Sequence, residues 1–326
     1  MRLVEQLRLA VPGGQTCSAG VAEWDPDESL SLLFTSADAA LYQAKRTGRN
    51  GTRHHSHAAS AVLELRRALR QEELVVHYQP ILTLATVEVD GVEALVRWQH
   101  PERGFLLPGQ FLPAVEVSDV MAEVGHFVLA QACRQAALWR ASGGPRSVAV
   151  NVSGQELLLP IYLAQLRQVL TSTGLPPQAL VLEVTETSLD ADASISLEVL
   201  AAVRQLGVRV AIDDFGTGYS SLSRLGRLPA DILKIDRSFV RDIGPDTIRA
   251  PLIQAILALA DALALDVVAE GVEHPHQARL LRSLGCARVQ GFLYSRAVPA
   301  AAVPQALLPR SAGAVPARPP LVAAPY

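Results

Sequence analysis

Two adjacent carboxylates, Asp213 and Asp214, directly follow an apolar run in which Val208, Val210 and Ile212 alternate. This alternation is typical of a buried strand. Like charges this close raise each other's pKa unless a cation lies between them, so the pair is a candidate site for a divalent metal. Two other interpretations stay open: the pair could cap a following helix, or the turn could bind a dinucleotide.

The turn after the acidic pair is rich in glycine. Gly216 and Gly218 allow the backbone to turn sharply, and residues 219–225 then carry apolar side chains at helical spacing. The stretch therefore predicts a strand, a tight turn and a helix. A dinucleotide loop is the weaker interpretation, because a third glycine is missing and the acidic pair precedes the turn.

The acidic pair is one of several polar groups found near the ends of apolar runs. In chain order, seven runs supply Glu93, Asn151, Glu183, Asp213 with Asp214, Lys234, Glu270 and Gln290. Any one alone is ordinary for a helix cap or a solvated edge, whereas the full series favours chemistry. Carboxylate and amide oxygens, without histidine or thiolate, suit Mg²⁺ or Mn²⁺. Two such ions would support hydrolysis of a phosphate ester.

The elements that must position these groups alternate along the chain. Strands are expected at residues 74–78, 87–98, 147–152, 180–184, 208–214, 231–235, 265–269 and 287–289, and helices at residues 61–74, 120–139, 161–170, 194–206, 251–263 and 277–284. This alternation predicts an α/β fold, a modified (β/α)8 TIM-like barrel with its active site where the strands end. The first two strands are joined too tightly for a helical crossover, so the first is expected to be antiparallel.

Composition narrows the class of protein. The 326 residues are 49% hydrophobic and 19% charged, and the net charge is −3 with a pI of ≈ 6.2, which argues against binding long nucleic acid. Three scattered cysteines indicate neither disulfides nor zinc and fit a reducing cytoplasm. The longest apolar segment, residues 251–265, is too short to span a bilayer, so no membrane segment is expected.

The expected domain organisation has four parts. Residues 1–52 are a truncated α/β fragment, with helices at 4–11 and 37–46 and a strand at 16–23, and residues 53–60 are a polar linker. Residues 61–308 form the barrel, and residues 309–326 are an Ala/Pro-rich disordered tail. The fragment resembles the C-terminal end of a GGDEF, diguanylate cyclase-like, domain in residues 18–22 and 37–50. The loop that names that domain is absent, so cyclase activity is not expected.

Residues 61–308 resemble the EAL-domain family of cyclic di-GMP phosphodiesterases. The motifs that carry this resemblance are Tyr78-Gln-Pro80, Glu93-Ala-Leu-Val-Arg-Trp98, Asn151-Val-Ser153, Leu182-Glu-Val-Thr-Glu186, the stretch 213–222, Leu233-Lys-Ile-Asp236, Ala269-Glu-Gly-Val-Glu273 and Gln290-Gly291. The resemblance implies a barrel whose first strand is antiparallel. It also implies cleavage of cyclic di-GMP to linear pGpG.

The resemblance implies a role for each site residue. The expected ligands of two Mg²⁺ or Mn²⁺ ions are Glu93, Asn151, Glu183, Asp213, Asp214 and Asp236. Lys234 is expected to orient the attacking water and Glu270 to be the candidate general base. Glu186 and Glu273 would support the loop after Glu183 and the neighbouring ligands. Expected substrate contacts are Gln79, Leu95, Arg97 and Gln290.

Some of these side chains have simpler interpretations. Arg97 could stack on Trp98 at the surface. Asp236 could only balance the charge of Lys234, and Gln79 could satisfy a buried turn.

The main hypothesis is therefore an active metal-dependent phosphodiesterase. The alternatives are a catalytically silent cyclic di-GMP receptor and a scaffolding module. A receptor would be expected to lack one or more of the acidic groups, and here all are present. The departures from the family pattern, at Val115 and Asp119, would alter the shape of the substrate pocket without removing a catalytic group. A homodimer is a further hypothesis from the resemblance.

Overall fold

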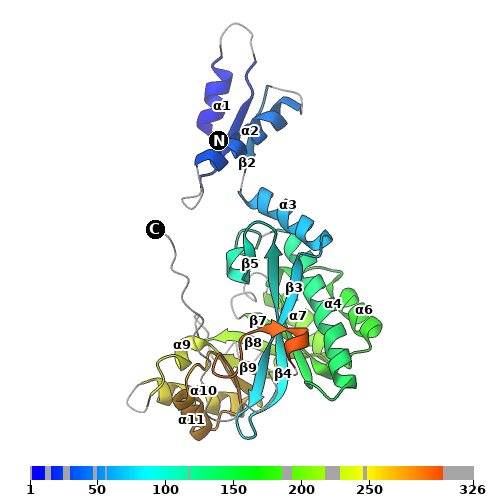
Figure 1. Ribbon diagram of the computed structural model, residues 1–326, viewed down its shortest axis with the longest axis vertical. Coiled ribbons are helices and arrows are strands. Elements are labelled where there is room, and N and C mark those ends of the chain that lie inside the picture. Colours follow the sequence, from blue (N-terminus) through cyan, green and yellow to red (C-terminus); the bar gives the residue numbers. More distant parts are fainter. Residues whose placement is uncertain are drawn as a thin grey trace. The chain divides into compact units, whose positions relative to one another are not determined.

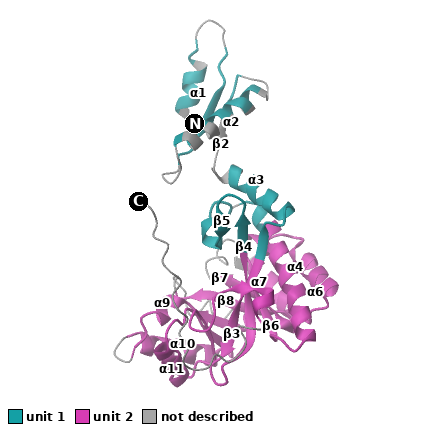
Figure 2. Cartoon of the chain, viewed as in Figure 1, with its two compact units in different colours: residues 1–75, 97–121 teal, residues 76–96, 122–326 magenta. Residues whose placement is uncertain are grey.

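The computed structural model describes residues 2–11, 16–24, 30–46, 50–55, 57–116, 118–185, 193–216, 228–244 and 248–303. The chain divides into two compact units (Figure 2). One comprises residues 1–75 and 97–121, and the other comprises residues 76–96 and 122–326. The expected helix at residues 219–225 and the tail at 309–326 lie outside the described residues, as does Glu186.

The first unit begins with a small α/β element. It contains α1 (Arg2–Leu9), β1 (Ala19–Ala22), α2 (Leu30–Arg46), β2 (Thr52–His55) and α3 (His57–Arg70). Strands β1 and β2 are parallel, with Ala19 opposite Thr52. Gly20 permits close packing of α2 on β1, because an added Cβ would lie 2.2 Å from the carbonyl oxygen of Ala37. The same unit contains β5 (Gly104–Leu106) and η1 (Pro108–Gln110).

Secondary structure extends into the stretch expected to be a linker, residues 53–60. β2 extends to His55, and α3 begins at His57 instead of residue 61. The expectation rested on the polar side chains of this stretch. The strand forms because its backbone groups find partners in β1, which is distant from it in the sequence.

Eight strands form a closed barrel (Figure 1). In chain order they are β3 (Leu74–Thr83), β4 (Glu88–His100), β6 (Ser147–Asn151), β7 (Leu180–Thr185), β8 (Arg209–Phe215), β9 (Ile232–Ile235), β10 (Asp266–Ala269) and β11 (Arg288–Gln290). The ring closes because β3 pairs with both β4 and β11. β3 is antiparallel to β11, whereas the pairs from β4 round to β11 are parallel. The predicted barrel with an antiparallel first strand is confirmed.

Helices and short segments follow the strands. They are α4 (Val120–Ala141), α5 (Gly154–Leu157), α6 (Tyr162–Thr173), η2 (Pro177–Ala179), α7 (Ala193–Gln205), α9 (Arg237–Val240), α10 (Arg249–Ala262), α11 (Pro275–Ser283), β12 (Val298–Pro299) and η4 (Ala300–Ala302). Figure 1 shows α4 and α6 on one side of the strands and α10 and α11 on the other. The five helices expected between residues 120 and 284 are confirmed, with ends that shift by a few residues.

The barrel interior contains a layer of apolar side chains. Its buried layer consists of Ile81, Ala149, Val181, Ala211, Ile232 and Val268. These strands are apolar on both faces, as expected where helices cover a parallel sheet. Their sequences are therefore continuous apolar runs. This packed layer fixes the strands, and therefore the side chains at their carboxyl ends.

Charged side chains pair at the opposite, amino-terminal end of the strands. Arg288 contacts Asp90 at 2.8 Å and Asp266 at 3.1 Å, and Arg209 contacts Asp266 at 2.5 Å. Each of these side chains keeps part of its surface in solvent, so each pair is expected to contribute only about 0–1 kcal/mol.

Among the described helices, none combines the length and the apolar character that crossing a bilayer requires.

Candidate active site

Lys234 lies at the centre of a cluster of carboxylates. Its side chain comes from β9 and is 1% exposed. The Nζ atom lies 2.6 Å from Glu270, 2.7 Å from Glu183, 3.2 Å from Asp213 and 3.8 Å from Glu93. These four carboxylates come from four different strands or the residue directly after one. The parallel barrel therefore gathers at one rim groups that are widely separated in the sequence.

A chain of amides fixes the orientation of Glu93. Its Oε1 accepts a hydrogen bond from Asn151 Nδ2 at 2.8 Å, and its Oε2 accepts one from Gln290 Nε2 at 2.6 Å. Gln290 Nε2 also donates to Gln79 Oε1 at 3.1 Å, and Gln79 Nε2 donates to the carbonyl oxygen of Ser295. Gln290 Oε1 is buried and has no hydrogen-bond partner among the described residues. An additional donor in this place would satisfy it.

The cluster holds more negative charge than its lysine can neutralise. Burial raises the pKa of Glu183, although Lys234 opposes the rise. Burial also raises the pKa of Glu270 to about 7, again against the effect of Lys234. For Lys234 itself, burial would lower the pKa, but Glu183 and the other carboxylates together hold it well above its usual value. One ammonium among four carboxylates leaves an electrostatic demand for a further cation.

Asp213 and Asp214 differ in their exposure to solvent. Asp213 is buried at the end of β8, whereas Asp214 is exposed and adopts a positive φ of 54°. The backbone N–H of Asp214 donates to Asp213 Oδ1 at 2.9 Å. Gly216, with φ 94°, completes the turn, and a Cβ added there would lie 2.6 Å from the ring of Phe239. The predicted sharp turn is confirmed as far as Gly216.

A cleft of ≈ 770 Å³ opens beside the cluster. Asp214, Asp236 and Glu270 line its acidic side, and Arg237 and Arg241 also line it. Oxygen atoms of Asp213, Asp214 and Glu270 lie within 4.8 Å of one another, close enough to bind one metal ion. The carboxylate of Asp236 accepts the backbone N–H of Ser238 at 2.9 Å and so caps α9.

The structure brings most of the predicted site residues together. Glu93, Asn151, Glu183, Asp213, Lys234, Glu270, Gln79 and Gln290 form one connected network. The described ion pairs of Lys234 do not include Asp236, so Asp236 is a helix cap at the cleft and not the partner of that lysine.

Leu95, Glu273 and Arg97 also lie outside this network. Leu95 is half-buried on β4, and Glu273 is exposed at the cleft. Arg97 is 8% exposed on β4, so its side chain does not lie at the surface. It belongs to the other compact unit, and its contact with a substrate phosphate stays a prediction.

Sequence reasoning missed the basic side of the cleft. Arg237 is the first residue of the four-residue helix α9, which Asp236 caps, and Arg241 directly follows that helix. Both arginines line the cleft. Gly271 permits this arrangement, because it has a φ of 68° and an added Cβ would lie 2.4 Å from Arg237 Cβ. The available signal was Asp236 itself, an N-cap residue type directly after an apolar strand, which would have placed residue 237 at the rim.

Comparison with known proteins identifies the family. The EAL domain model matches residues 62–297. The chain belongs to the EAL domain family. The bifunctional diguanylate cyclase/cyclic di-GMP phosphodiesterase MucR of Pseudomonas aeruginosa is 42% identical over 295 residues, which are 87% of this chain and 43% of MucR. The cyclic di-GMP phosphodiesterase NbdA of the same organism is 42% identical over 321 residues, 94% of this chain and 41% of NbdA.

A solved EAL structure supports the assignment of the fold. The structure of the P. aeruginosa MucR phosphodiesterase in complex with c-di-GMP superimposes with a TM-score of 0.70 and 44% identity. The match covers 74% of this chain and 98% of the MucR chain. This chain spans about two fifths of the length of the curated relatives MucR and NbdA. The acidic rim described above therefore belongs to an EAL-type barrel.

Proposed function

We propose that this chain hydrolyses cyclic di-GMP to linear pGpG in a metal-dependent reaction. The observation that carries the proposal is the cluster of four carboxylates around Lys234, which opens on a cleft at the carboxyl ends of the strands. The family relatives named as cyclic di-GMP phosphodiesterases support the choice of substrate.

The residues present fit hard divalent cations. Glu93, Asn151, Glu183 and Asp213 would hold the first, and Asp213, Asp214 and Asp236 the second. Three observations support this: the oxygen-rich donor set, the excess of carboxylates over cations, and the unpartnered Gln290 Oε1, which could accept from a metal-bound water. When bound, Mg²⁺ or Mn²⁺ would activate water and stabilise the charge on the reacting phosphate.

The chain's own side chains have complementary tasks. Lys234 holds Glu183, Asp213 and Glu270 in place and provides positive charge near the reacting phosphate. Glu270, whose pKa of about 7 suits it for proton transfer, is the candidate base. Arg97 is proposed to bind a substrate phosphate, and Leu95, Gln79 and Gln290 to contact the substrate. Glu186 and Glu273 are proposed to support the ligands.

Asp214 offers a test that separates charge from backbone conformation. Asp214→Asn keeps a side chain that tolerates positive φ but loses one charge, so we expect weaker Mn²⁺ binding with unchanged resistance to urea. Asp214→Val should lose both Mn²⁺ affinity and resistance to urea, because it removes the carboxylate and because a β-branched residue at this φ costs about 1–3 kcal/mol. Mn²⁺ titration and urea unfolding would distinguish them. Wild-type Mn²⁺ affinity in Asp214→Asn would exclude Asp214 as a ligand.

The segment 1–52 is proposed to be the C-terminal remnant of a GGDEF-like domain. The match to NbdA covers 94% of this chain. The residues that the match leaves out are fewer than those of segment 1–52, so part of this segment aligns with NbdA. The helix–strand–helix order with a second parallel strand agrees with an incomplete α/β domain.

The hydrolysis proposal is tested by incubating the purified protein with cyclic di-GMP and Mg²⁺ or Mn²⁺, and following pGpG by chromatography. We expect product that requires metal and disappears in EDTA and in Asp213→Ala. Tight binding of intact cyclic di-GMP without product would instead favour the receptor alternative.

A further inference from the structure

The segment directly after Asn151 is held by an unusually buried carboxylate. The N–H of Val152 donates to the carbonyl oxygen of Glu183 at 2.8 Å, and α5 begins two residues later. Ser153 donates to Glu156 Oε2 from both its backbone N–H, at 2.9 Å, and its hydroxyl, at 2.7 Å. In return, the N–H of Glu156 donates to Ser153 Oγ. The chain is thus fixed within two residues of Asn151.

Glu156 is buried, although side chains that cap a helix end are usually exposed. It is 6% exposed, and in the described part of the chain no basic side chain forms an ion pair with it. A glutamine could make the same reciprocal cap without the cost of burying a charge. The carboxylate is therefore costly for a helix of only four residues.

Helix α4 is shaped around this carboxylate. A Cβ added at Gly125 would lie 1.7 Å from Glu156 Oε1, so Glu156 reaches its position only because residue 125 has no side chain. The contact joins α4 to the turn that follows β6. A displacement of Glu156 would consequently be transmitted to Ser153, and from there to the end of β6.

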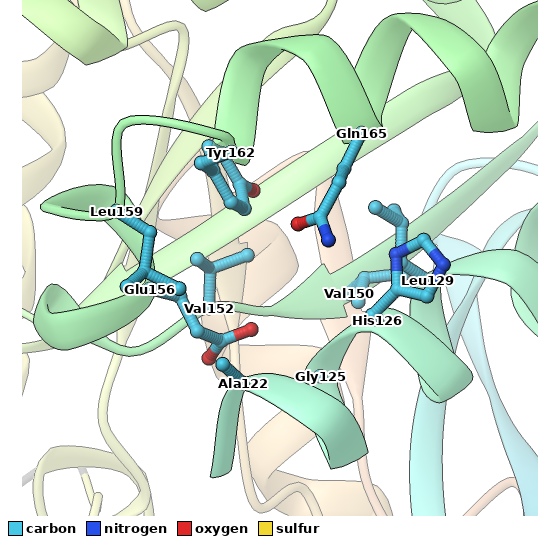
Figure 3. Close-up of a pocket in the computed structure, with 10 residues that line it drawn as sticks. All are labelled: Ala122, Gly125, His126, Leu129, Val150, Val152, Glu156, Leu159, Tyr162 and Gln165. Carbon is cyan, nitrogen blue, oxygen red and sulfur yellow. The ribbon is translucent and has the colours of Figure 1, made fainter. Parts of the chain in front are cut away.

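A small cavity extends this arrangement beneath Asn151. It is lined by Val150 and Val152, the two neighbours of Asn151, together with Glu156 and Tyr162. Figure 3 shows the Tyr162 hydroxyl and the Glu156 carboxylate at the edge of this space. The hydroxyl is buried and has no hydrogen-bond partner among the described residues. A volume of ≈ 10 Å³ is close to what one water molecule needs.

We propose that Glu156 is a positioning residue for Asn151, acting through Ser153 and the wall of this cavity. It sets the placement of the Asn151 amide, which orients Glu93 in the acidic cluster. The inference rests on the proposed function, since it concerns the affinity of that cluster for a divalent metal. Glu156 itself touches neither the cluster nor the cleft.

The test compares Mn²⁺ binding in the intact chain, measured by calorimetry, for Glu156→Ala, Glu156→Gln and Leu166→Ala. We expect Glu156→Ala to weaken Mn²⁺ binding by about 10–100-fold, as removal of a supporting partner does at metal sites. Glu156→Gln should restore most of it, because the amide can still accept from Ser153. Leu166, buried on α6, is the matched control: its truncation lowers the urea midpoint without changing Mn²⁺ affinity.

Unchanged Mn²⁺ affinity in Glu156→Ala, with the wild type still hydrolysing cyclic di-GMP, would overturn the positioning role and leave the proposed function intact. Weakening by Leu166→Ala to the same extent would also overturn it, because a general loss of stability would then explain the effect. If Glu156→Ala does not fold, Gly125→Ala tests the same contact and is expected to weaken binding, and wild-type affinity there overturns the proposal. A wild type that binds no Mn²⁺ would overturn both proposals.

Discussion

Replacing Lys234 with methionine is expected to lower the turnover of cyclic di-GMP by at least ~10²-fold, as loss of a preorganised charge at a reacting centre does. The same substitution should reduce the free energy of unfolding in EDTA by about 3–5 kcal/mol, because among the described residues it removes the only cation that pairs with these four carboxylates, three of which are buried. Initial rates and urea unfolding measure the two effects.

Arg288→Met is the matched control for this substitution. Arg288 also pairs with two carboxylates, but it lies at the other end of the barrel and its side chain is 25% exposed. We expect a loss of stability of about 0–2 kcal/mol, from two exposed pairs, and normal turnover. If Lys234→Met and Arg288→Met unfold at the same urea concentration, Lys234 is not the electrostatic centre of the site.

Replacing Asp213 with asparagine is expected to abolish hydrolysis while preserving the fold. The loss should exceed the ~10–100-fold typical of groups that only support a metal ligand. The amide oxygen can still accept the backbone N–H of Asp214, and Lys234 retains three other carboxylates, so the urea midpoint should stay close to that of the wild type.

Asp231→Asn is the control for Asp213→Asn. Asp231 also accepts a backbone N–H, from Val210 at 2.9 Å, but lies away from the cluster beside Arg204. The Asp231→Asn variant should retain the turnover of the wild type. Equal rates for wild type and Asp213→Asn in the presence of metal would remove Asp213 from the ligand set.

The positions of the site residues along the chain could be predicted because strand periodicity is local. An alternating run that ends in Asp213 or Glu183 identifies a strand end, and parallel strands bring such ends to the same rim. The antiparallel first strand followed from the short connection before residue 88. These features need only neighbouring residues and one topological rule.

The arrangement inside the site could not be predicted from the same signals. That one ammonium, Lys234, contacts four carboxylates depends on the register of several strands, which the sequence pattern does not specify. The pairing of β2 with β1 and the contact of Glu156 with Gly125 likewise join segments far apart in sequence. Arg237 and Arg241 were missed because their own patterns are those of ordinary surface residues.

The most direct test of the central claim is anomalous diffraction from crystals of the protein grown with Mn²⁺. The account predicts Mn²⁺ peaks at the strand ends, within coordination distance of carboxylate oxygens of Asp213 and its neighbours, and loss of the peaks in Asp213→Asn. An active protein whose Mn²⁺ ions lie elsewhere, or whose acidic cluster binds none, would contradict the assignment of this rim as the metal-dependent active site.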